Sequence, residues 1–398
     1  MVRRVRVSWR RIAIFLIPLL LTFGILPTLL PEQAALAQQR VRRARAPGGD
    51  AAIEAMRRKV NANTVSIVSG NITGSYLRYA ADIASVVDDG DNMRVLPILS
   101  AGAVQNVSDI LFLKGVDMGL VRTDSVEALR REGKYGGLEN SVQYIARLVD
   151  DEMHVVASKD ITDIRQLAGK KVNFDVVGSG THFSCELIFE RLGIKVEPTS
   201  YEQSVAYQKL RAGEIAASIF FGGTPVIGIT NFDNSDGRFH LVPVQFDQKL
   251  ADYYLPARLT AKTYPNLLGK DGQIDTVAAP TLLAVANLKP GNERYERVAR
   301  FVDAFFSKFS DLTKPPRHPK WREVNLTATA PGWTRFKPAQ DWLEKVTKAA
   351  DAGGQAGAAS DEMARFRAYV KQHSAGATLT PEDTVRLFEQ FKKGSGKP

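Results

Sequence analysis

Two short polar turns in this chain contain the residue types that bind anions. One turn is Ser69–Tyr76 and the other is Gly178–Thr181, and each lies between an apolar run typical of a strand and a stretch typical of a helix. The N-terminus of a helix has unpaired backbone N–H groups and about half a unit of positive charge, so it attracts anions. We predict that both turns contact one small anionic ligand, through residues that offer N–H or hydroxyl donors: Gly74, Ser75, Tyr76, Ser179, Gly180 and Thr181.

Two further segments follow predicted strands in the same way. The turn Ser100–Asn106 precedes another helical stretch and contributes Gly102 and Asn106, and the glycines Gly222 and Gly223 follow an apolar run. Residues just past the C-terminal end of a parallel strand point into the ligand crevice of an α/β protein. Glycine also lets the backbone approach a ligand closely. These four residues therefore join the predicted binding site.

Arg122 and Asp124 follow the predicted buried strand Met118–Val121. An arginine at this position pairs bidentately with a ligand carboxylate, or it is a surface residue paired with Asp124 or Glu127. The sequence leaves both interpretations open. Arg122 and Asp124 are accordingly included among the candidate ligand contacts.

The sequence lacks the residue patterns of the common enzyme and metal sites. Its five histidines form no H-x-x-x-H or H-E-x-x-H pattern, and the single Cys185 excludes a cysteine-based metal cluster. Val176 stands where a G-x-S-x-G turn around Ser179 needs its first glycine, and Phe183 stands where a dinucleotide-binding fingerprint needs its third. His182 beside Ser179 is the best hydrolase candidate. We predict no cofactor, no metal and no catalytic residue.

The elements that must position these residues alternate between strands and helices, which predicts parallel sheets with crossover helices. Two β-rich runs, Tyr144–Val149 and Met153–Ala157, are divided by acidic residues and are predicted to carry the chain from a first lobe into a second. The apolar run Asp275–Ala286 is predicted to carry it back. Two crossings make a hinge, and a hinge permits two lobes to close around a ligand. The helical apolar spacing of Tyr295–Leu312 predicts that its aromatic residues belong to the core.

The first 37 residues have the pattern of a secretion signal: a basic start, the apolar run Ile12–Leu30 and an A-x-A site at Ala35–Ala37. We predict cleavage after Ala37 and an exported, soluble mature chain, with an uncleaved membrane anchor as the alternative. The formal net charge is +10, and arginines crowd the start of the mature chain. Because no aromatic residues lie among them, they are predicted to form a flexible leader and not a nucleic-acid-binding arm.

These patterns divide the chain into six expected segments. The prolines of Pro315–Pro319 predict a stiff linker, after which helical patterns follow at Ala339–Ala350, Asp361–Gln372 and Pro381–Lys393. The expected segments are a signal peptide (1–37), a basic flexible leader (38–61), the first part of lobe one (62–150), lobe two (151–260), the return to lobe one (261–313) and a helical C-terminal extension (314–398).

In this order and context, the motifs resemble the TAXI-type substrate-binding subunits of tripartite ATP-independent periplasmic (TRAP) transporters, from about Thr64 to Leu288. The pieces that carry the resemblance are the turn Ser69–Tyr76, the turn Ser100–Asn106, the strand Asp117–Val121 with Asp124, and the segments Gly178–Thr181, Gly213–Ala217 and Gly222–Pro225.

The resemblance implies an α/β protein with the type II periplasmic-binding-protein fold, in which two Rossmann-like lobes are joined by a two-crossing hinge. It also implies a function: a periplasmic receptor would capture a small anionic solute, often a glutamate-like amino acid or a dicarboxylate. It would then deliver the solute to a membrane permease driven by an ion gradient.

Three alternatives remain from the sequence. A sensor subunit could have the same fold without a transport partner, and a neighbouring permease gene would separate the two functions. A secreted serine hydrolase would use Ser179 and His182, although no carboxylate near His182 in the sequence is evident to orient it. A structural envelope protein with a vestigial pocket would bind no ligand.

Overall fold

The computed structural model describes residues 47–352 except 73, 91, 132 and 134–139. The predicted signal peptide, the first part of the leader and the last two predicted helices lie outside these residues. Part of the expected leader forms helix α2 (Pro47–Ala62), whose first turn contains Asp50 and whose last turn contains Lys59, as the helix dipole favours. The chain divides into two compact units between Lys59 and Val60. Among the described residues, no helix is both long enough and apolar enough to cross a membrane.

The described part of the second unit is built on a ten-stranded sheet. Its strands are β1 (Thr64–Val68), β2 (Arg94–Ile98), β3 (Met118–Arg122), β4 (Val142–Ser158), β5 (Lys171–Asn173), β6 (Glu197–Thr199), β7 (Ala217–Gly222), β8 (Phe239–Leu241), β9 (Leu255–Thr260) and β10 (Gln273–Ala286). They lie in the order β2-β1-β3-β10-β4-β7-β5-β6, with β8 paired to β4 and β9 paired to β10. The pairs β1–β2, β1–β3, β5–β6 and β5–β7 are parallel, as predicted.

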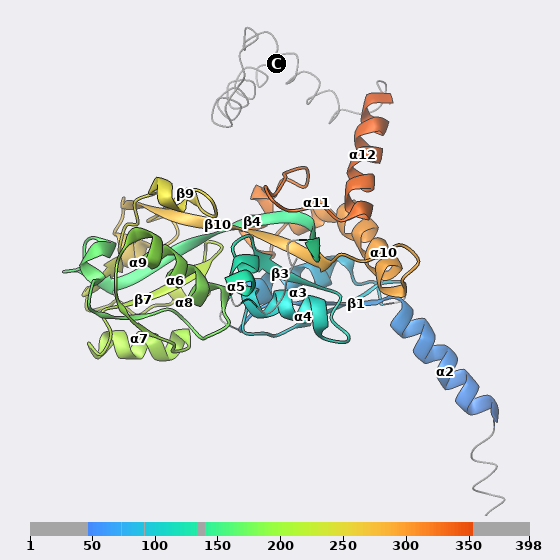
Figure 1. The fold of residues 1–398 in the computed structure, drawn as a ribbon, viewed down its shortest axis with the longest axis horizontal. Helices are drawn as coiled ribbons and strands as arrows, with labels where there is room; N and C mark the ends of the chain where they lie inside the picture. The colour runs from blue at the N-terminus through green and yellow to red at the C-terminus, as the bar shows by residue number, and fades with distance from the viewer. Residues whose placement is uncertain (1–46, 73, 91, 132, 134–139, 353–398) are drawn as a thin grey trace, which may run out of the picture. The chain divides into compact units, whose positions relative to one another are not determined.

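Two long antiparallel strands, β4 and β10, run side by side and join the two ends of the sheet (Figure 1). The acidic residues of β4 predict two separate strands, and this prediction is wrong, because β4 is one strand of 17 residues. Asp151 lies opposite Ala279 of β10, and Glu152 lies opposite Gly222 of β7. Pairing with neighbours on both sides thus overrides the low strand propensity of the acidic residues. The register of β10 against β4 shifts between Pro280 and Leu282.

We call the elements around β1–β3 the first lobe and those around β5–β9 the second lobe. The helices of the first lobe are α3 (Ser75–Val87), α4 (Ala103–Phe112), α5 (Ser125–Arg131), α10 (Glu293–Ser307), α11 (Phe309–Leu312), the 3₁₀ turn η4 (Pro319–Glu323) and α12 (Lys337–Ala352). Those of the second lobe are η2 (Ile164–Leu167), α6 (Gly180–Leu192), α7 (Gln203–Arg211), α8 (Ile227–Thr230), η3 (Gln248–Leu250) and α9 (Pro265–Leu268).

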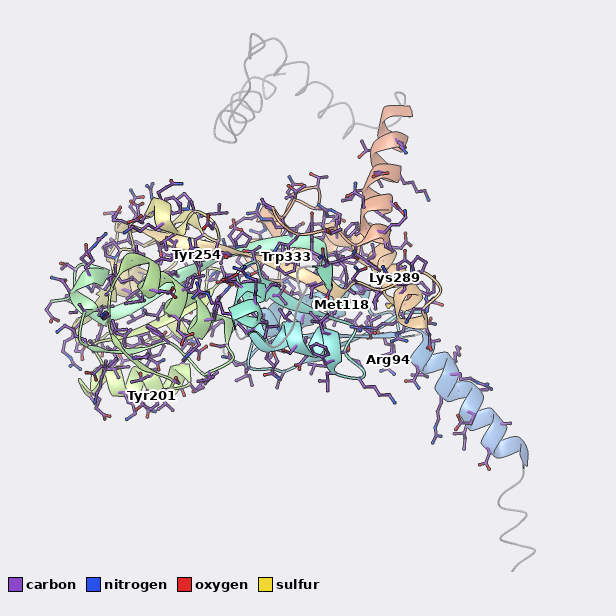
Figure 2. The ribbon with its side chains drawn as sticks, viewed as in Figure 1. Arg94, Met118, Tyr201, Tyr254, Lys289 and Trp333 are labelled. Atoms are coloured by element: carbon purple, nitrogen blue, oxygen red, sulfur yellow. The ribbon has the colours of Figure 1, made fainter. Side chains whose placement is uncertain are left out.

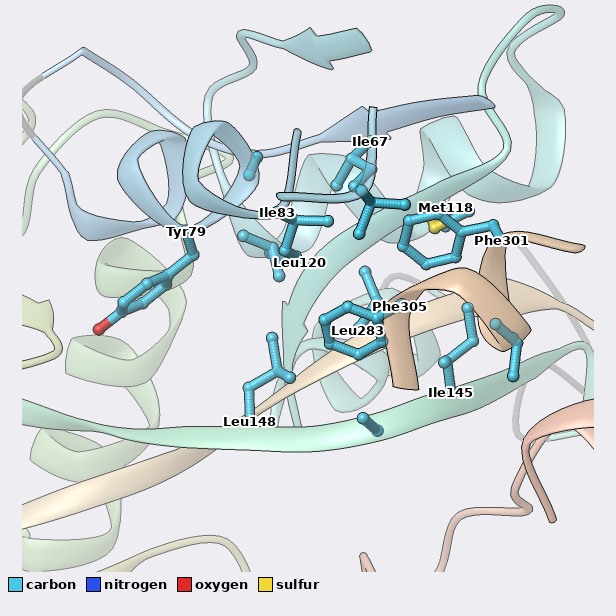
Figure 3. Packing of buried hydrophobic residues seen from close by; sticks show 14 of the residues in the cluster. Ile67, Tyr79, Ile83, Met118, Leu120, Ile145, Leu148, Leu283, Phe301 and Phe305 are labelled. Carbon is cyan, nitrogen blue, oxygen red and sulfur yellow. The ribbon is translucent and has the colours of Figure 1, made fainter. Parts of the chain in front are cut away.

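Each lobe has its own apolar core. In the first lobe, Phe301 and Phe305 of α10 are fully buried and pack with Ile67, Ile83 and residues of β3 and β4 (Figure 3). This confirms that the aromatic residues of the predicted helix belong to the core. In the second lobe, one cluster gathers the buried side chains of β7 and α6 with those of β4 and β10. Both lobes therefore pack on the same two crossing strands.

The segment 318–323, which we call the strap, contacts both lobes. Asp82 of α3 accepts hydrogen bonds from His318 N (2.8 Å) and Trp321 Nε1 (2.9 Å), and Trp321 is fully buried in the first core. Lys320 pairs with Glu152 of β4. The other Glu152 oxygen accepts bonds from the backbone N and Oγ1 of Thr224, both at 3.0 Å. Part of the predicted linker and the residues that follow it therefore pack against the folded lobes.

Candidate functional site

A small cavity of about 40 Å³ lies where the strand ends of the two lobes meet. In the same measure a water molecule needs about 10–15 Å³, so the cavity has room for roughly three water-sized groups. Residues of both lobes line it. Those that the sequence analysis predicts are Gly74, Ser75, Tyr76, Gly102 and Arg122 of the first lobe and Ser179, Gly180 and Thr181 of the second.

Three helix N-termini converge on this cavity. They belong to α3, α4 and α6, and the residues before or in the first turn of each helix line the wall. The N-cap residues of α3 and α4, Gly74 and Gly102, offer no side-chain cap, and Gly102 has a φ of 131° that disfavours other residues. Ser179 caps α6 by accepting a bond from His182 N (3.1 Å). The remaining N–H groups and the helix dipoles give this part of the wall a positive potential.

Gly180 allows the two lobes to approach each other. A Cβ atom built on it would lie 2.8 Å from Ala103 Cβ and 2.8 Å from Arg122 Nη2. Such distances essentially never occur for real Cβ atoms, so only glycine fits without a shift of its neighbours. A Cβ on Gly74 would approach no atom as closely: its nearest neighbours would be Asn71 Oδ1 at 3.1 Å, Phe220 Cζ at 3.6 Å and Asn71 O at 3.7 Å. The second-lobe turn is thus the tighter of the two.

Arg122 lies on the cavity wall and is 2% exposed, so the interpretation of Arg122 as a surface residue is wrong. Its Nε donates to Asp124 Oδ1 (3.4 Å), its Nη2 donates to Ser184 Oγ, and its guanidinium lies 4.7 Å from the centre of the Phe221 ring. Burial lowers the pKa of Arg122, but the charge of Asp124 and other neighbours outweighs this and raises the pKa above its ordinary value. Arg122 is therefore a permanent cation at the cavity.

Asp124 does not line the cavity but connects the lobes behind it. Its Oδ2 accepts bonds from Ser184 Oγ of α6 and from Tyr254 Oη (2.9 Å), which also belongs to the second lobe and is labelled in Figure 2. Asp124 is fully buried. Since Arg122 and Asp124 come from the first lobe, this polar network crosses the interface between the lobes.

Asn106, Gly222 and Gly223 also lie outside the cavity wall. Asn106 Nδ2 donates to the carbonyl oxygens of Ser69 and Leu120, both at 2.6 Å, so its amide holds two strand ends together. Gly223 N donates to Ser75 Oγ (3.2 Å), and a Cβ on Gly223 would lie 1.9 Å from Tyr79 Oη. These residues position the wall instead of forming it.

Two carboxyl groups of the wall, those of Asp151 and Asp175, are not among the residues predicted from the sequence. Asp151 is 1% exposed; its Oδ2 accepts a bond from Thr281 Oγ1 (2.9 Å), and its Oδ1 has no hydrogen-bond partner among the described residues. Asp175 is 2% exposed, has a φ of 66°, and also has an Oδ1 without a partner there. Burial raises the pKa of each carboxyl group to about 6.

The remaining lining residues are mostly apolar or small: Gly70, Asn71, Ala101, Ala103, Phe220 and Phe221. The two phenylalanines belong to β7, and the others belong to turns that the sequence analysis identified without choosing these positions. Among the described residues, no group of three or more His, Cys, Asp or Glu side chains is arranged to hold a metal ion.

The geometry does not support the serine hydrolase alternative. The Ser179 hydroxyl accepts a bond from the backbone N of His182, not from its ring. The ring nitrogens of His182 lie near other groups, with Nδ1 3.2 Å from Asp175 O and Nε2 3.4 Å from Glu186 Oε1. A histidine that activates a serine must contact its Oγ, and this contact is missing from the described residues.

Two lobes, a two-strand crossing and a polar cavity between the strand ends are the architecture of the type II periplasmic-binding-protein fold that the sequence predicts. The chain belongs to the NMT1-like family, which it matches over residues 67–331.

Several solved structures resemble the chain at low sequence identity. The TctC solute-binding protein from Polaromonas is 14% identical, with 72% of this chain and 98% of that chain covered and a TM-score of 0.41. An amino acid ABC transporter substrate-binding protein from Streptococcus pneumoniae, bound to L-arginine, is 14% identical over 69% of this chain and 99% of that chain, with a TM-score of 0.38. The periplasmic aliphatic sulphonate binding protein SsuA from Escherichia coli is 12% identical over 71% and 83%, with a TM-score of 0.36.

Proposed function

We propose that this protein is a periplasmic receptor that captures a small carboxylate-bearing solute between its lobes and delivers it to the membrane permease of a TRAP transporter. The observation that carries the proposal is the convergence of three helix N-termini and Arg122 on one cavity whose wall comes from both lobes. Such a wall attracts a carboxylate and offers it several N–H donors. A pocket shared by two lobes also couples ligand binding to closure.

Capture would proceed by rotation of the lobes about β4 and β10. The ligand carboxylate would first meet the donors of one lobe, and closure would bring the second set of N–H groups against it. The bonds of Asp124 to Ser184 and Tyr254 form only when the lobes are together, so they stabilise the closed state. Closure excludes water, and electrostatic interactions strengthen as the local dielectric falls.

The TRAP assignment rests on the TAXI-type motifs quoted from the sequence, and membership in the NMT1-like family is compatible with a transport role. In that assignment the solute is a glutamate-like amino acid or a dicarboxylate, and an ion gradient drives its uptake. A sensor subunit with the same cavity remains the second candidate. The proposed segment boundaries and the cleaved signal peptide belong to the same proposal.

Mass spectrometry of small molecules that co-purify with the periplasmic protein tests the binding function. We expect a small molecule with at least one carboxylate, released on denaturation. Gly180→Val should lose this molecule, because its side chain would collide with Ala103 and Arg122 and prevent closure. N-terminal sequencing of the same material should begin at Gln38. A protein that co-purifies only with neutral sugars would contradict the proposal.

Reconstitution in proteoliposomes tests the transport partner. The receptor and a TRAP permease from the same organism should together take up the co-purified solute when an ion gradient is imposed, and omission of the receptor should abolish uptake. Specific binding of the solute without uptake by any encoded permease would favour the sensor.

A further inference from the structure

Two carboxyl groups of the cavity wall have no role in the carboxylate capture described above. Asp151 of β4 and Asp175, in the turn before α6, are both at least 98% buried, and the Oδ1 atom of each lacks a hydrogen-bond partner among the described residues. Buried polar atoms in native proteins nearly always have partners, and an unpaired buried carboxylate is costly. A cationic ligand group would remove this cost.

The charges around the cavity favour a ligand with both signs of charge. Arg122 and the helix N-termini supply the positive part of the wall, but the Arg122 charge is already offset by Asp124 behind it. Asp151 and Asp175 supply two further negative groups. A dicarboxylate would bring a second anion toward these groups, whereas an ammonium group brings three N–H donors.

We infer that the ligand is a short zwitterion, whose carboxylate contacts Arg122 and the N-terminus of α6 and whose ammonium group pairs with Asp151. This inference rests on the proposed function, because it uses the same cavity and the same carboxylate contact. Asp175 contributes negative potential without being the main partner, since its own turn lies beside the α6 N-terminus. The cavity volume of about 40 Å³ suits the shortest amino acids better than glutamate.

Asp151 is the group whose charge changes with pH at the proposed ammonium position, because its neighbours keep their protonation states. Tyr76 and Tyr79 face it from α3, and burial raises the pKa of both, so they stay protonated. Arg122 faces it from β3 and stays charged. Its neighbour Glu152 is paired with Lys320. Near Asp175, the charged or titratable groups are His182, Glu202, Cys185 and Tyr207, and burial raises the pKa of both Cys185 and Tyr207.

A pH dependence of binding follows from these surroundings. Burial raises the pKa of Asp151 to about 6, and an ammonium ligand would lower it again. Zwitterion binding should therefore release a proton near pH 6, and affinity should increase as the pH rises from 5 to 7. A dicarboxylate held by protonated Asp151 and Asp175 would show the opposite trend.

Calorimetric titration of the mature protein tests the inference with six probes: glycine, L-alanine, β-alanine, acetate, succinate and ethylamine. At pH 7 at least one of the zwitterions should bind at least about tenfold more tightly than succinate or acetate. Asp151→Asn should weaken that zwitterion by at least about tenfold, because it removes one member of a buried charge pair. Asp175→Asn should have a smaller effect in the same direction.

Asp150→Asn is the matched control. Asp150 is the preceding residue of the same strand, but its side chain is 36% exposed and pairs with Arg147 at 2.8 Å. It should leave zwitterion affinity unchanged. Thermal melts of each variant check that it is folded, and the wild-type pH series needs no variant at all.

The outcomes separate the inference from the function on which it rests. Tighter binding of succinate or acetate than of every zwitterion, with affinity that falls from pH 5 to 7, would overturn the inference and leave carboxylate capture standing. Equal zwitterion affinity in Asp151→Asn and the wild type would also overturn it. If no probe with a carboxylate binds, the short-zwitterion inference is wrong, and a further titration with L-glutamate that also shows no binding would contradict the proposed carboxylate capture.

Discussion

The cavity has two charged sides, and the buried charge is paired on one side and partly unpaired on the other. On one side, Arg122 is held by Asp124, which in turn accepts bonds from Ser184 and Tyr254. On the other side, Asp151 has one oxygen bonded to Thr281 and one without a partner among the described residues. The paired side stabilises the closed protein itself, whereas the unpaired side costs stability until a ligand arrives. Buried charge therefore stabilises the protein in one place, and under the inference above it recognises a ligand in the other.

Among the changes that test this comparison, removal of the Asp124 side chain should lower the free energy of unfolding most. Asp124→Ala leaves the Arg122 cation buried and unpaired, and breaking a buried pair in this way typically costs about 3–5 kcal/mol. Denaturant unfolding should show this loss in the free energy of unfolding. Asp150→Asn, on the more exposed side of β4, should change it by less than about 0.5 kcal/mol. A loss below about 1 kcal/mol for Asp124→Ala would mean that the paired side does not stabilise the fold.

Tyr254→Phe should have the next largest effect. It removes a 2.9 Å hydrogen bond to the Asp124 carboxylate, and hydrogen bonds to charged groups contribute about 1.5–3 kcal/mol. Because Tyr254 and Asp124 belong to different lobes, small-angle scattering should also show a more open average conformation. Tyr295→Phe is a suitable control, since its hydroxyl makes no hydrogen bond to a described residue. An unchanged scattering curve for Tyr254→Phe would contradict a role in closure.

Asp151→Asn should act in the opposite direction on the ligand-free protein. It removes a buried carboxylate whose ionisation is unfavourable, so the free energy of unfolding at pH 7 should increase by about 1–2 kcal/mol. The gain should vanish at pH 4, where the wild-type carboxyl group is already protonated. Chemical unfolding at both pH values measures the difference. Destabilisation at pH 7 would show that the Asp151 charge is structural.

The last prediction concerns the pH dependence of the ligand-free wild type, to which Asp175 contributes together with Asp151. Asp151 and Asp175 have folded-state pKa values of about 6, above the ordinary value of 3.8. The folded state therefore binds more protons than the unfolded state between pH 4 and 6, and this contribution to stability falls as the pH rises through that window. The wild type should lose more stability from pH 4 to 7 than the double variant Asp151→Asn/Asp175→Asn. Identical pH profiles would contradict the raised pKa values.

Local patterns were sufficient to predict one side of the comparison but not the other. Glycine, serine and threonine turns between a strand and a helix predict helix N-termini, and the turns at Gly74, Gly102 and Gly180 do reach the cavity. The two lobes and their crossings are also predictable from the alternation of strands and helices. Asn106 shows the limit of this reasoning. Its amide could bind a ligand or two backbone carbonyl groups, and the sequence alone does not distinguish these roles.

The acidic neighbours of Asp151 in the sequence make its burial unpredictable from local pattern. Three consecutive acidic residues are typical of an exposed connection, and the sequence analysis treats them so. The burial of Asp151 depends on β10 and β7, which are more than 60 residues away in the chain and pair with both edges of β4. Asp175 depends on a local φ of 66°, which residue type alone does not reveal. Long-range pairing and unusual backbone conformation thus determine the part of the site that local patterns miss.

The strap has a consequence for how the lobes would move. Through Lys320, Glu152 and Thr224 it ties the end of β7 to the first lobe next to the crossing strands, and His318 Nε2 lies 3.3 Å from Pro225 O at the same place. A rotation that keeps these contacts has its axis close to Thr224. The residues farthest from that axis would then move the greatest distance. A small rotation near the strap would therefore separate the two lobes widely at the positions farthest from it.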